Sequence, residues 1–415
     1  DIPDSPSARA RAAKHASRAT AAAPSTAKNA AIRRMASLLD ENRAHIAKAN
    51  DADLDAARTK GLDSSLVDRL VFGEQKIDSP IRCLEKIASL DDPVGRPFRT
   101  DTLHNGIVAT RVRVPLGVVM MVYEARPHVT CNAGALCLKA GNAAILRGGS
   151  EAATCNALLG RLWRAALADA GLPGAAVQVI SGSHDEIAEL LHCADDIDLV
   201  IPRGGKGLIA AVAVQSRIPV IKHYAGVCHV YVDAAADLDQ ALAIALDSKT
   251  LMPEVCNAME TTLVHADRLG DLPTIVAAFR NAGVAVRGCD RTQQAVPDVE
   301  PATDEDWTAE YLDMTVSLRV VDSVDAAIDH INTFGSHHTD SIVTDSRRAA
   351  AAFTAAVDSG VVLVNASTMF CDGETLGIGA EIGISTDKIH ARGPMGLEEL
   401  TSYKHVLLGN GQVMG

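Results

Sequence analysis

The pattern of hydrophobic and polar residues predicts a helical beginning for this chain. Over the first ~90 residues, apolar positions such as Ala31, Met35 and Leu38 recur at helical spacing, and polar residues such as Arg34 stand between them. A segment containing proline and glycine, residues 91–95, then interrupts this pattern. We therefore expect several amphipathic helices before the first strand.

A rhythm of alternating strands and helices follows a polar, strand-like segment at 99–114, which is typical of an exposed hairpin. In a first series, strands are expected at 118–123, 143–146, 177–180 and 199–201, with helices at 130–139, 151–169 and 185–192. In a second series, which starts near residue 229, strands are expected at 262–264, 284–287, 317–321, 341–344 and 361–365. This rhythm predicts an α/β protein with mostly parallel sheets and helices on both sheet faces.

Composition adds size and class to this picture. A chain of 415 residues exceeds what one compact core usually holds, so we expect two or three domains. Hydrophobic residues make up 47% and charged residues 22%, which is typical of a globular protein. No repeat of solenoid period and no low-complexity linker is visible.

The charge and the apolar runs exclude some partners. A formal net charge of −13 argues against nucleic acid, which demands clustered Lys and Arg, but leaves room for a local cationic pocket that binds a phosphorylated small molecule. No apolar run approaches the ~18 residues of a membrane span, and the first residues lack a signal-peptide pattern. A cytoplasmic location is therefore expected.

The nine cysteines do not form a recognisable ligand or disulfide pattern. Their number is odd and none stand in a Cys-x-x-Cys arrangement, so we expect neither a disulfide framework nor a zinc site, and no metal is predicted. Most of them are expected to be small core residues. The exception considered is Cys256, which lies in a turn-rich stretch where an exposed thiol beside backbone amides can act as a nucleophile; a buried cysteine is the alternative.

Two glycine-containing loops are candidates for phosphate binding, although the dinucleotide fingerprint Gly-x-Gly-x-x-Gly and the Walker loop are absent. Gly204 and Gly205 follow an expected strand and precede a helix, which suits either a phosphate or a tight strand–helix connection. Arg147 ends another expected strand, where its guanidinium and the Ser150 hydroxyl suit a cofactor phosphate. Alternatively, Ser150 is a helix N-cap and Glu151 enters the first turn.

Six sequence blocks carry a family resemblance. They are residues 115–127, 138–151, 201–205, 253–261, 379–386 and 390–397. In this order the chain resembles the γ-glutamyl phosphate reductase family of proline biosynthesis, from its first helices to its last strand. The resemblance implies an aldehyde-dehydrogenase-like α/β fold, with two Rossmann-like domains and a small oligomerisation β-flap.

The resemblance also implies domains and an activity. The expected domains are an NADP(H)-binding domain at 1–228 that includes oligomerisation strands at 99–114, a catalytic domain at 229–390, and a C-terminal return segment with an oligomerisation strand at 391–415. The implied reaction is NADPH-dependent reduction of γ-glutamyl phosphate to glutamate γ-semialdehyde and phosphate, the second step of proline biosynthesis from glutamate. It would pass through a thioester on Cys256.

Catalytic roles carry over to three positions. Cys256 falls at the family's nucleophile, and the adjacent Asn257 is a further catalytic candidate. Arg126 lies near the position of an oxyanion-binding Asn in the wider superfamily, so it is expected to bind the oxyanion or the departing phosphate; pairing with Glu124 is the alternative. Aldehyde-oxidising relatives keep a Glu base in a stretch that here begins with His223, so hydrolysis of the thioester is not expected, although His223 is itself a possible base.

Cofactor and substrate roles carry over less specifically. Arg147 with Ser150 suits the 2′-phosphate of NADPH, and Glu310 aligns with a Glu that holds the nicotinamide ribose, unless it is a solvated surface carboxylate. The candidates for the substrate's phosphate and amino-acid end are Asn365, Ser367, Thr368 and Arg392. His128 departs from the Asn or Asp that is common in the family.

The sequence also gives expectations for the oligomeric state, the functional partner and the alternative activities. The strand-like segments 99–114 and 402–408 predict a homodimer or homotetramer, and a glutamate 5-kinase is the expected functional partner. The rival activities are those of an aldehyde dehydrogenase or acyl-CoA reductase with the same fold. A non-catalytic nucleotide-binding relative is the alternative from another class.

Overall fold

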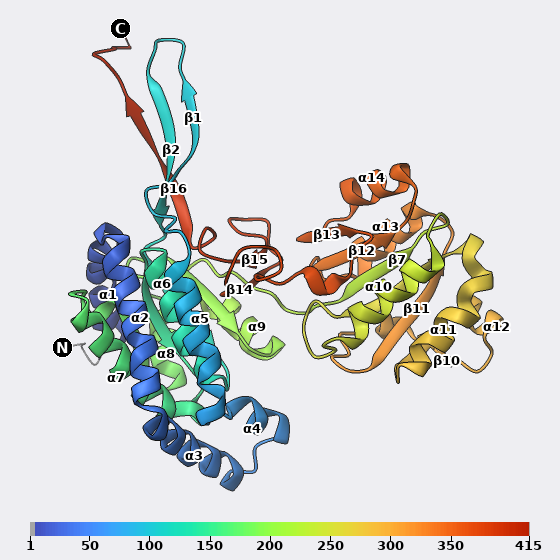
Figure 1. The fold of residues 1–415 in the computed structure, drawn as a ribbon, viewed down its shortest axis with the longest axis horizontal. Coiled ribbons are helices and arrows are strands. Elements are labelled where there is room, and N and C mark those ends of the chain that lie inside the picture. Colours follow the sequence, from blue (N-terminus) through green and yellow to red (C-terminus); the bar gives the residue numbers. More distant parts are fainter. Residues whose placement is uncertain (1–4, 415) are drawn as a thin grey trace. The chain divides into compact units, whose positions relative to one another are not determined.

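The computed structural model describes residues 5–414, which fold into two compact units. The first unit holds the chain up to Lys222, together with Ile378–Gly383 and the segment from Met395 onward. The second unit holds His223–Gly377 and Ile384–Pro394. Both are drawn in Figure 1.

The first unit is built on a four-stranded parallel sheet in the order β5-β4-β3-β6. Its strands are β3 (Val118–Tyr123), β4 (Ala143–Arg147), β5 (Val177–Ile180) and β6 (Leu199–Arg203). Its helices are α1 (Pro6–Ala22), α2 (Ser25–Glu41), α3 (Arg43–Thr59), α4 (Ser64–Leu70), α5 (Asp78–Ser89), α6 (Pro127–Lys139), α7 (Ala153–Asp169), α8 (His184–Leu191) and α9 (Lys206–Gln215). The strand order places a switch in connection direction between β3 and β6.

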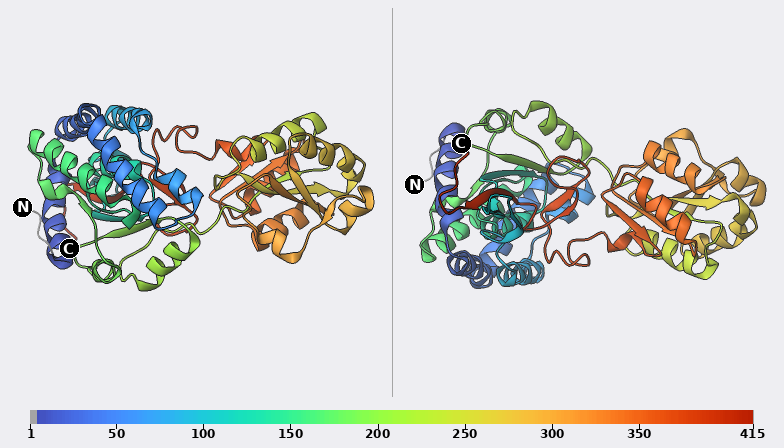
Figure 2. Two further views of the ribbon diagram at one scale, coloured as in Figure 1. Left: turned by 90° about the horizontal axis from the view of Figure 1, so that it is seen from below. Right: turned by 90° about the horizontal axis from the view of Figure 1, so that it is seen from above.

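Alternate residues of the central strand β3 explain the layers of this unit. Val118, Met120 and Val122 join an apolar cluster with residues of α1, α8 and α9. All six residues of β3 are buried, so the residues between these three are covered on the opposite face, where α6 contacts β3 and β4. Helices therefore cover both faces of the sheet, as Figure 2 shows.

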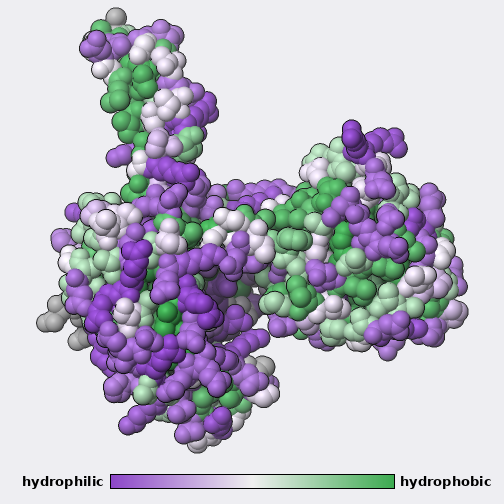
Figure 3. Space-filling view, in the orientation of Figure 1, coloured by the Kyte–Doolittle hydropathy of each residue, from purple (hydrophilic) through white to green (hydrophobic). Residues whose placement is uncertain are grey.

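A separate antiparallel sheet also belongs to the first unit. It joins β1 (Pro97–Thr102), β2 (Val108–Pro115) and β16 (Thr401–Leu408), with β2 in the middle. In Figure 1 it extends away from the helices of its unit. Figure 3 shows hydrophobic side chains along it, and those of Phe98, Tyr403, Leu407 and Leu408 are exposed.

The second unit is built on a seven-stranded parallel sheet in the order β10-β9-β11-β8-β7-β12-β13. Its strands are β7 (Cys228–Val232), β8 (Met259–His265), β9 (Ala285–Gly288), β10 (Glu300–Pro301), β11 (Thr315–Val321), β12 (Thr339–Val343) and β13 (Val361–Val364). Its α-helices are α10 (Leu238–Thr250), α11 (Leu272–Asn281), α12 (Asp290–Ala295), α13 (Val324–Phe334) and α14 (Arg347–Ala356). A short pair, β14 (Gly383–Ser385) and β15 (Gly393–Met395), accompanies the chain's return.

Alternate strand residues again separate two apolar clusters. Val230 and Val232 of β7 pack with α10 and α11 in one cluster, whereas Tyr231 between them packs with Phe353 of α14 in the other. Successive side chains of a strand point to opposite faces, so this division means that each face of the sheet has its own helical cover. The expected α/β fold with parallel sheets is confirmed. Among residues 5–414, no helix combines the length and apolar character needed to cross a membrane.

Candidate active site

Cys256 lies in the loop between α10 and β8, at the amino end of β8. Its side chain is half-buried, and the loop is formed by turns in which Val255 donates to the carbonyl of Met252 and Ala258 donates to that of Val255. This irregular backbone lets the thiol reach partly into solvent, whereas Met259, the first residue of β8, is fully buried.

Gly226, in the segment that precedes β7, packs closely against the backbone of the Cys256 loop. A Cβ atom at Gly226 would lie 1.7 Å from the carbonyl oxygen of Cys256, so only glycine fits this approach. The N–H of Gly226 donates to Oε1 of Glu310 over 2.6 Å, and Sγ of Cys228 donates to the same Cys256 carbonyl over 3.3 Å. Glu310 thus supports the nucleophile's loop through Gly226, and it is half-buried, unlike a solvated surface carboxylate.

Two imidazoles stand beside the thiol. One ligand atom from each of His223, Cys256 and His338 lies within 4.8 Å of the other two. The two rings are 4.7 Å apart between centroids and meet edge to face. The N–H of Val227 donates to Oγ of Ser336 over 2.8 Å, which ties the segment after His223 to the segment before His338.

His338 is held in one orientation and kept neutral. It is 1% exposed, and its Nδ1 lies 2.7 Å from Oγ1 of Thr339. Burial, and then the charge of His223, lowers the pKa of His338 well below its ordinary value. A neutral imidazole beside Cys256 is a potential proton acceptor for the thiol.

Asn257 connects the Cys256 loop to the segment after β13. Its Nδ2 donates to the carbonyl oxygens of Thr368 and Met369 over 3.2 and 3.4 Å. Ser367 caps the 3₁₀ turn Thr368–Phe370 by accepting from the N–H of Met369, and its hydroxyl also contacts that of Ser248 in α10. The structure thus brings Asn257, Ser367 and Thr368 together, as a packed support of the loop.

Asn365 lies at the other end of the strands. It follows β13 with φ of 54°, a left-handed conformation that asparagine tolerates and that turns the chain back. Its Oδ1 accepts from the N–H of Thr344, and its Nδ2 donates to the Thr344 carbonyl, over 2.8 and 3.0 Å. Five-residue β12 separates this cap from the amino strand ends by ~16 Å. The role of Asn365 at a substrate stays a prediction.

Arg392 lies at the amino end of β13, where Asp358 holds it. Its Nη2 lies 2.9 Å from both the carbonyl and Oδ1 of Asp358, and Nζ of Lys388 lies 2.6 Å from Oδ2 of the same carboxylate. Hydrogen bonds from Lys388 and Arg392 outweigh burial and lower the pKa of Asp358. The Nε of Arg392 has no hydrogen-bond partner among the described residues. That Nε is buried, but the side chain as a whole is 26% exposed, so its charge can attract an anion.

These groups share one location in the second unit. Cys256, His223 and His338 precede β8, β7 and β12, and Asp358 precedes β13. The strands β8-β7-β12-β13 are consecutive neighbours in the sheet. Because amino ends of parallel strands meet at one edge, segments far apart in sequence form a continuous row there.

In the first unit, cationic side chains gather at carboxyl strand ends instead. Arg147 and Arg203 are the last residues of β4 and β6, and Arg126 follows β3 between them. Nε of Arg147 is buried without a hydrogen-bond partner among the described residues. Burial, and then the charges of Arg126, Lys76 and Arg203, lowers the pKa of His128 to about 4. This edge is therefore suited to anionic groups.

Two glutamates fill the loops of this edge. Oε2 of Glu124 accepts from the N–H of Gly205 over 2.9 Å, and a Cβ at Gly204 would lie 2.6 Å from the Glu124 carboxyl group. This favours the tight strand–helix connection at Gly204–Gly205, with Glu124 occupying an amide that a phosphate would use. Glu124 contacts Gly205 here.

The other glutamate, Glu151, closes the loop after β4. Its Oε1 accepts from the N–H of Ala125 over 2.8 Å. Ser150 is exposed and begins a 3₁₀ turn, while α7 starts at Ala153 with Ala152 as its N-cap, so the interpretation of Ser150 as the helix N-cap is wrong. Its hydroxyl is therefore not committed to capping.

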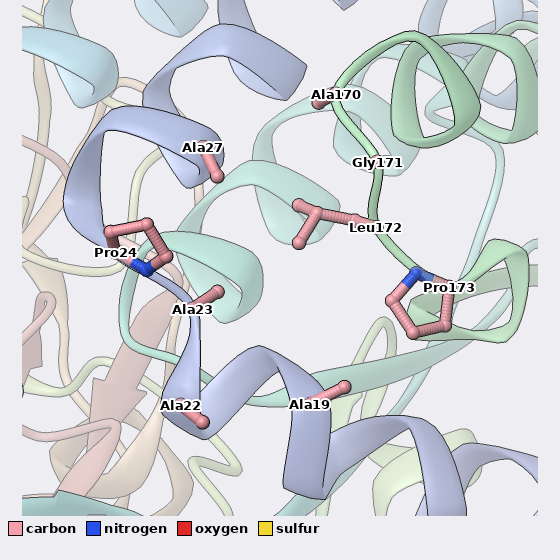
Figure 4. A pocket seen from close by; sticks show the side chains of 9 residues that line it. All are labelled: Ala19, Ala22, Ala23, Pro24, Ala27, Ala170, Gly171, Leu172 and Pro173. Atoms are coloured by element: carbon pink, nitrogen blue, oxygen red, sulfur yellow. The ribbon is translucent and has the colours of Figure 1, made fainter.

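A hollow elsewhere in the first unit lacks such chemistry. Its lining consists of Ala19, Ala22, Ala23, Pro24, Ala27, Ala170, Gly171, Leu172 and Pro173 (Figure 4). None of these side chains titrates or donates a hydrogen bond, so it is not the reaction site.

Sequence reasoning missed two members of these sites. His338 was not singled out, although a His-His pair before an expected strand is visible at 337–338. Arg203 lies in the block 201–205 but had no expected role, and its Nη1 lies 3.8 Å from Oε1 of Glu381. Like Arg147, it ends an expected strand, and this position could have indicated a role in anion binding.

Comparisons with known proteins show the family of the chain. The chain matches the aldehyde dehydrogenase family over residues 4–296. A γ-glutamyl phosphate reductase from Thermotoga maritima is 42% identical with a TM-score of 0.97, covering 99% of this chain and 100% of its own. The enzyme of that name from Saccharomyces cerevisiae is 30% identical with a TM-score of 0.55, covering 98% of both chains. An engineered glycolyl-CoA reductase solved with NADP⁺ is 14% identical with a TM-score of 0.68, covering 98% of this chain and 97% of its own, a likeness of fold alone.

Proposed function

This chain belongs to the aldehyde dehydrogenase family, and from that premise we propose that it is an NADPH-dependent reductase of γ-glutamyl phosphate. The products are glutamate γ-semialdehyde and inorganic phosphate, and the reaction is the second step of proline biosynthesis from glutamate. The observation that carries the proposal is the setting of Cys256: a half-buried thiol with imidazoles beside it, where oxidising relatives keep a carboxylate base. The 42% identity to a reductase of this name over its whole length supports it.

The thiol of Cys256 is the nucleophile in this mechanism. After it loses its proton, the thiolate attacks the γ-carbonyl carbon, a C–S bond forms, and the C–O bond to the phosphate breaks. Phosphate leaves with the electron pair, and a thioester remains on Cys256. When bound, NADPH would supply the hydride that adds to the thioester carbon. The C–S bond of the resulting thiohemiacetal on Cys256 then breaks, which gives the aldehyde and returns the Cys256 thiolate.

The residues around Cys256 orient this step. The backbone N–H of Cys256 is the proposed oxyanion donor, and Asn257 fixes that backbone through its bonds to the segment with Ser367 and Thr368. His223 or His338 is suited to accept the thiol proton. Without a carboxylate base in this role, water activation is disfavoured and the thioester persists for reduction.

Substrate anions are assigned to the two arginines. Arg392 is a partly exposed cation beside Asp358, which suits the amino-acid carboxylate or the phosphate. Arg126 is proposed for the oxyanion or the departing phosphate. Asn365 is also proposed to contact the substrate, which would use side-chain groups that now bond to the backbone of Thr344.

The cofactor fits the cationic edge of the first unit. The buried Nε of Arg147 lacks a partner among the described residues, and the exposed Ser150 hydroxyl follows it, so the pair suits the 2′-phosphate of NADPH. Gly204 and Gly205 allow close backbone approach, although Glu124 shares the Gly205 amide. Glu310 is proposed to hold the nicotinamide ribose.

Assembly and cellular context extend the proposal. The sheet β1-β2-β16 exposes apolar side chains at its strands, which fits a homodimer or homotetramer built on it. An acyl phosphate hydrolyses readily, so a glutamate 5-kinase in the same cytoplasmic compartment must supply the substrate.

The test is the reverse reaction with purified full-length protein. Glutamate γ-semialdehyde and NADP⁺ are mixed with and without inorganic phosphate, and NADPH formation is followed. The proposal requires a rate that depends saturably on phosphate. NADPH formation without phosphate would instead indicate a hydrolytic aldehyde dehydrogenase, and a requirement for coenzyme A would indicate an acyl-CoA reductase. No turnover under any condition would favour a non-catalytic nucleotide-binding protein.

A further inference from the structure

We propose that Cys256, His223 and His338 form a binding site for a thiophilic divalent cation, and that Zn²⁺ bound there reversibly blocks the nucleophile. The reductase reaction uses the same thiol without a metal. The inference concerns the resting thiol and its two imidazoles, and it does not depend on which acyl substrate the protein reduces.

The ligand set and its spacing match zinc. Zinc binds cysteine sulfur at ~2.3 Å and histidine nitrogen at ~2.0 Å in tetrahedral geometry, so its ligand atoms lie about 3.5 Å apart. In this structure the three ligand atoms lie within 4.8 Å of one another. Closing the site requires shifts of about 1 Å, which the half-buried side chains of Cys256 and His223 can make by rotation.

His338 is already prepared as a ligand. Nδ1 is engaged with Thr339, so Nε2 is the nitrogen left for a metal, and it has no hydrogen-bond partner among the described residues. At 1% exposure, a polar atom without a partner is costly, and a metal bond would remove that cost. Ligating histidines usually have their second nitrogen held in this way, which fixes the ring.

The bound state is chemically balanced and has a clear consequence. Zn²⁺ displaces the thiol proton: Cys–SH and Zn²⁺ give Cys–S–Zn⁺ and H⁺, with the imidazoles as neutral donors. Water completes the fourth position because the chain supplies three ligands. Coordination to zinc withdraws electron density from the sulfur and lowers its nucleophilicity, so the metal inhibits attack on an acyl carbon until a chelator removes it.

The first measurement uses Co²⁺ as a spectroscopic probe of the full-length protein, without nucleotide or substrate. We expect one Co²⁺ per chain, with a thiolate-to-cobalt charge-transfer band and the intense visible bands of four-coordination. Zn²⁺ should displace the cobalt, and EDTA should restore the starting spectrum. Absence of the charge-transfer band at one equivalent would overturn the proposal.

Variants assign the ligands. Cys256→Ser should remove the charge-transfer band, and His338→Gln should weaken Zn²⁺ binding by at least roughly a hundredfold, since losing a mere supporting partner already costs about 10- to 100-fold. Matched controls are Cys289→Ser and His330→Gln, a half-buried thiol and a buried imidazole of the same unit that lie outside the cluster. Unchanged zinc affinity in folded His338→Gln would refute the site.

Alkylation of Cys256 provides a readout that does not depend on activity, and its wild-type arm needs no variant. In the wild type, Zn²⁺ should slow modification of Cys256 by iodoacetamide, and EDTA should reverse this. In His338→Gln, the thiol should still be alkylated but no longer protected at the same Zn²⁺ concentration. Equal alkylation rates with and without Zn²⁺ in the wild type would overturn the proposal, even if the phosphate-dependent reductase assay succeeds.

Discussion

The two units place their functional groups at opposite ends of parallel strands. In the first unit, Arg147 and Arg203 end their strands at the carboxyl edge, beside the switch point between β3 and β6. In the second, Cys256 and His338 precede their strands at the amino edge. Open α/β sheets usually bind ligands outside the carboxyl ends, so the second unit departs from this rule.

At part of the carboxyl edge of the second unit, polar side chains bond to one another and to the backbone, which is consistent with a site at the other edge. Asp233 is 5% exposed and accepts from the hydroxyls of Tyr231 and Thr344 over 3.0 and 2.6 Å. Asn365 then binds both backbone groups of Thr344. At the carboxyl ends of β7, β12 and β13, these polar groups therefore bond to one another.

Both edges nevertheless rely on the same support. Glu124 and Glu151 accept from loop amides of Gly205 and Ala125 in the first unit, and Glu310 accepts from Gly226 in the second. Carboxylate–amide bonds of this kind hold loops that lack regular structure. In both units, the candidate site lies at the sheet edge where carboxylates hold the loop amides and other polar groups remain for a ligand.

The substitution with the largest expected effect on turnover is Cys256→Ala. Turnover should fall by about 10⁴-fold or more, because the covalent step is lost. NADPH binding, measured by fluorescence titration, should be unchanged, because its phosphate groups are assigned to the other unit.

Cys289→Ala is the matched control, because this thiol follows β9 at the carboxyl edge. Burial raises its pKa, but hydrogen bonds with Thr292 and the backbone of Val320 outweigh burial and lower it. Activity should survive its loss. If Cys289→Ala is inactive and Cys256→Ala is active, the nucleophile has been assigned to the wrong strand end.

Gly226→Ala tests the brace at the amino edge. The added Cβ would overlap the Cys256 carbonyl, a backbone atom that cannot move without shifting the thiol. We expect kcat/KM to fall by about 100-fold, as misplacement by ~1 Å can do, and the free energy of unfolding to fall by about 1–3 kcal/mol. Gly270→Ala, where a Cβ meets nothing within 4 Å, should be neutral in both measurements. If Gly226→Ala and Gly270→Ala had equal effects, the close packing of Gly226 against Cys256 would not explain the loss of activity.

Arg147→Ala tests charge recognition at the carboxyl edge of the first unit. Loss of hydrogen bonds to a charged phosphate costs about 1.5–3 kcal/mol, so the KM for NADPH should rise roughly 10- to 100-fold while that for NADH stays constant. Steady-state kinetics with both nucleotides measure this. Arg161→Ala, at an exposed position of α7, should change neither value. A parallel rise for NADH would argue against the 2′-phosphate contact.

Asp358→Asn is expected to have the smallest effect. Because its folded pKa is lowered from 3.8, the carboxylate contributes stability above pH ~4, and this contribution is lost as pH falls through the folded value. It is 36% exposed, so the difference should be at most about 0.5 kcal/mol. Thermal unfolding at pH 7 and pH 3, compared with Asp329→Asn, measures it. A loss above 2 kcal/mol would mean that this ion pair supports the fold far more than its exposure allows.

Much of the fold could be predicted because hydrophobic spacing encodes it. The expected strand at 118–123 coincides with β3, and that at 317–321 lies within β11, since each is a buried apolar run. The polar contacts at the carboxyl edge of the second unit could not be predicted. They depend on the left-handed turn at Asn365 and on its contact with Thr344, which spacing does not reveal.

For the site, sequence motifs located residues without showing what they touch. Cys256 was recognised from its block, but its proximity to His338 arises from tertiary contacts between three loops. Likewise, Glu310 was expected at a ribose, and the structure adds its bond to Gly226. Long-range contacts of this kind depend on strand order, which one sequence does not specify.

The exposed strand β16 bears on how the protein should be handled. It ends at Leu408, six residues before Met414, the last described residue, and Leu407 and Leu408 are 54% and 66% exposed. A purification tag or fluorescent label fused at the carboxyl terminus would stand beside these side chains and obstruct any subunit that covers them. Affinity handles are better attached ahead of α1, so that measured subunit stoichiometry reflects the protein itself.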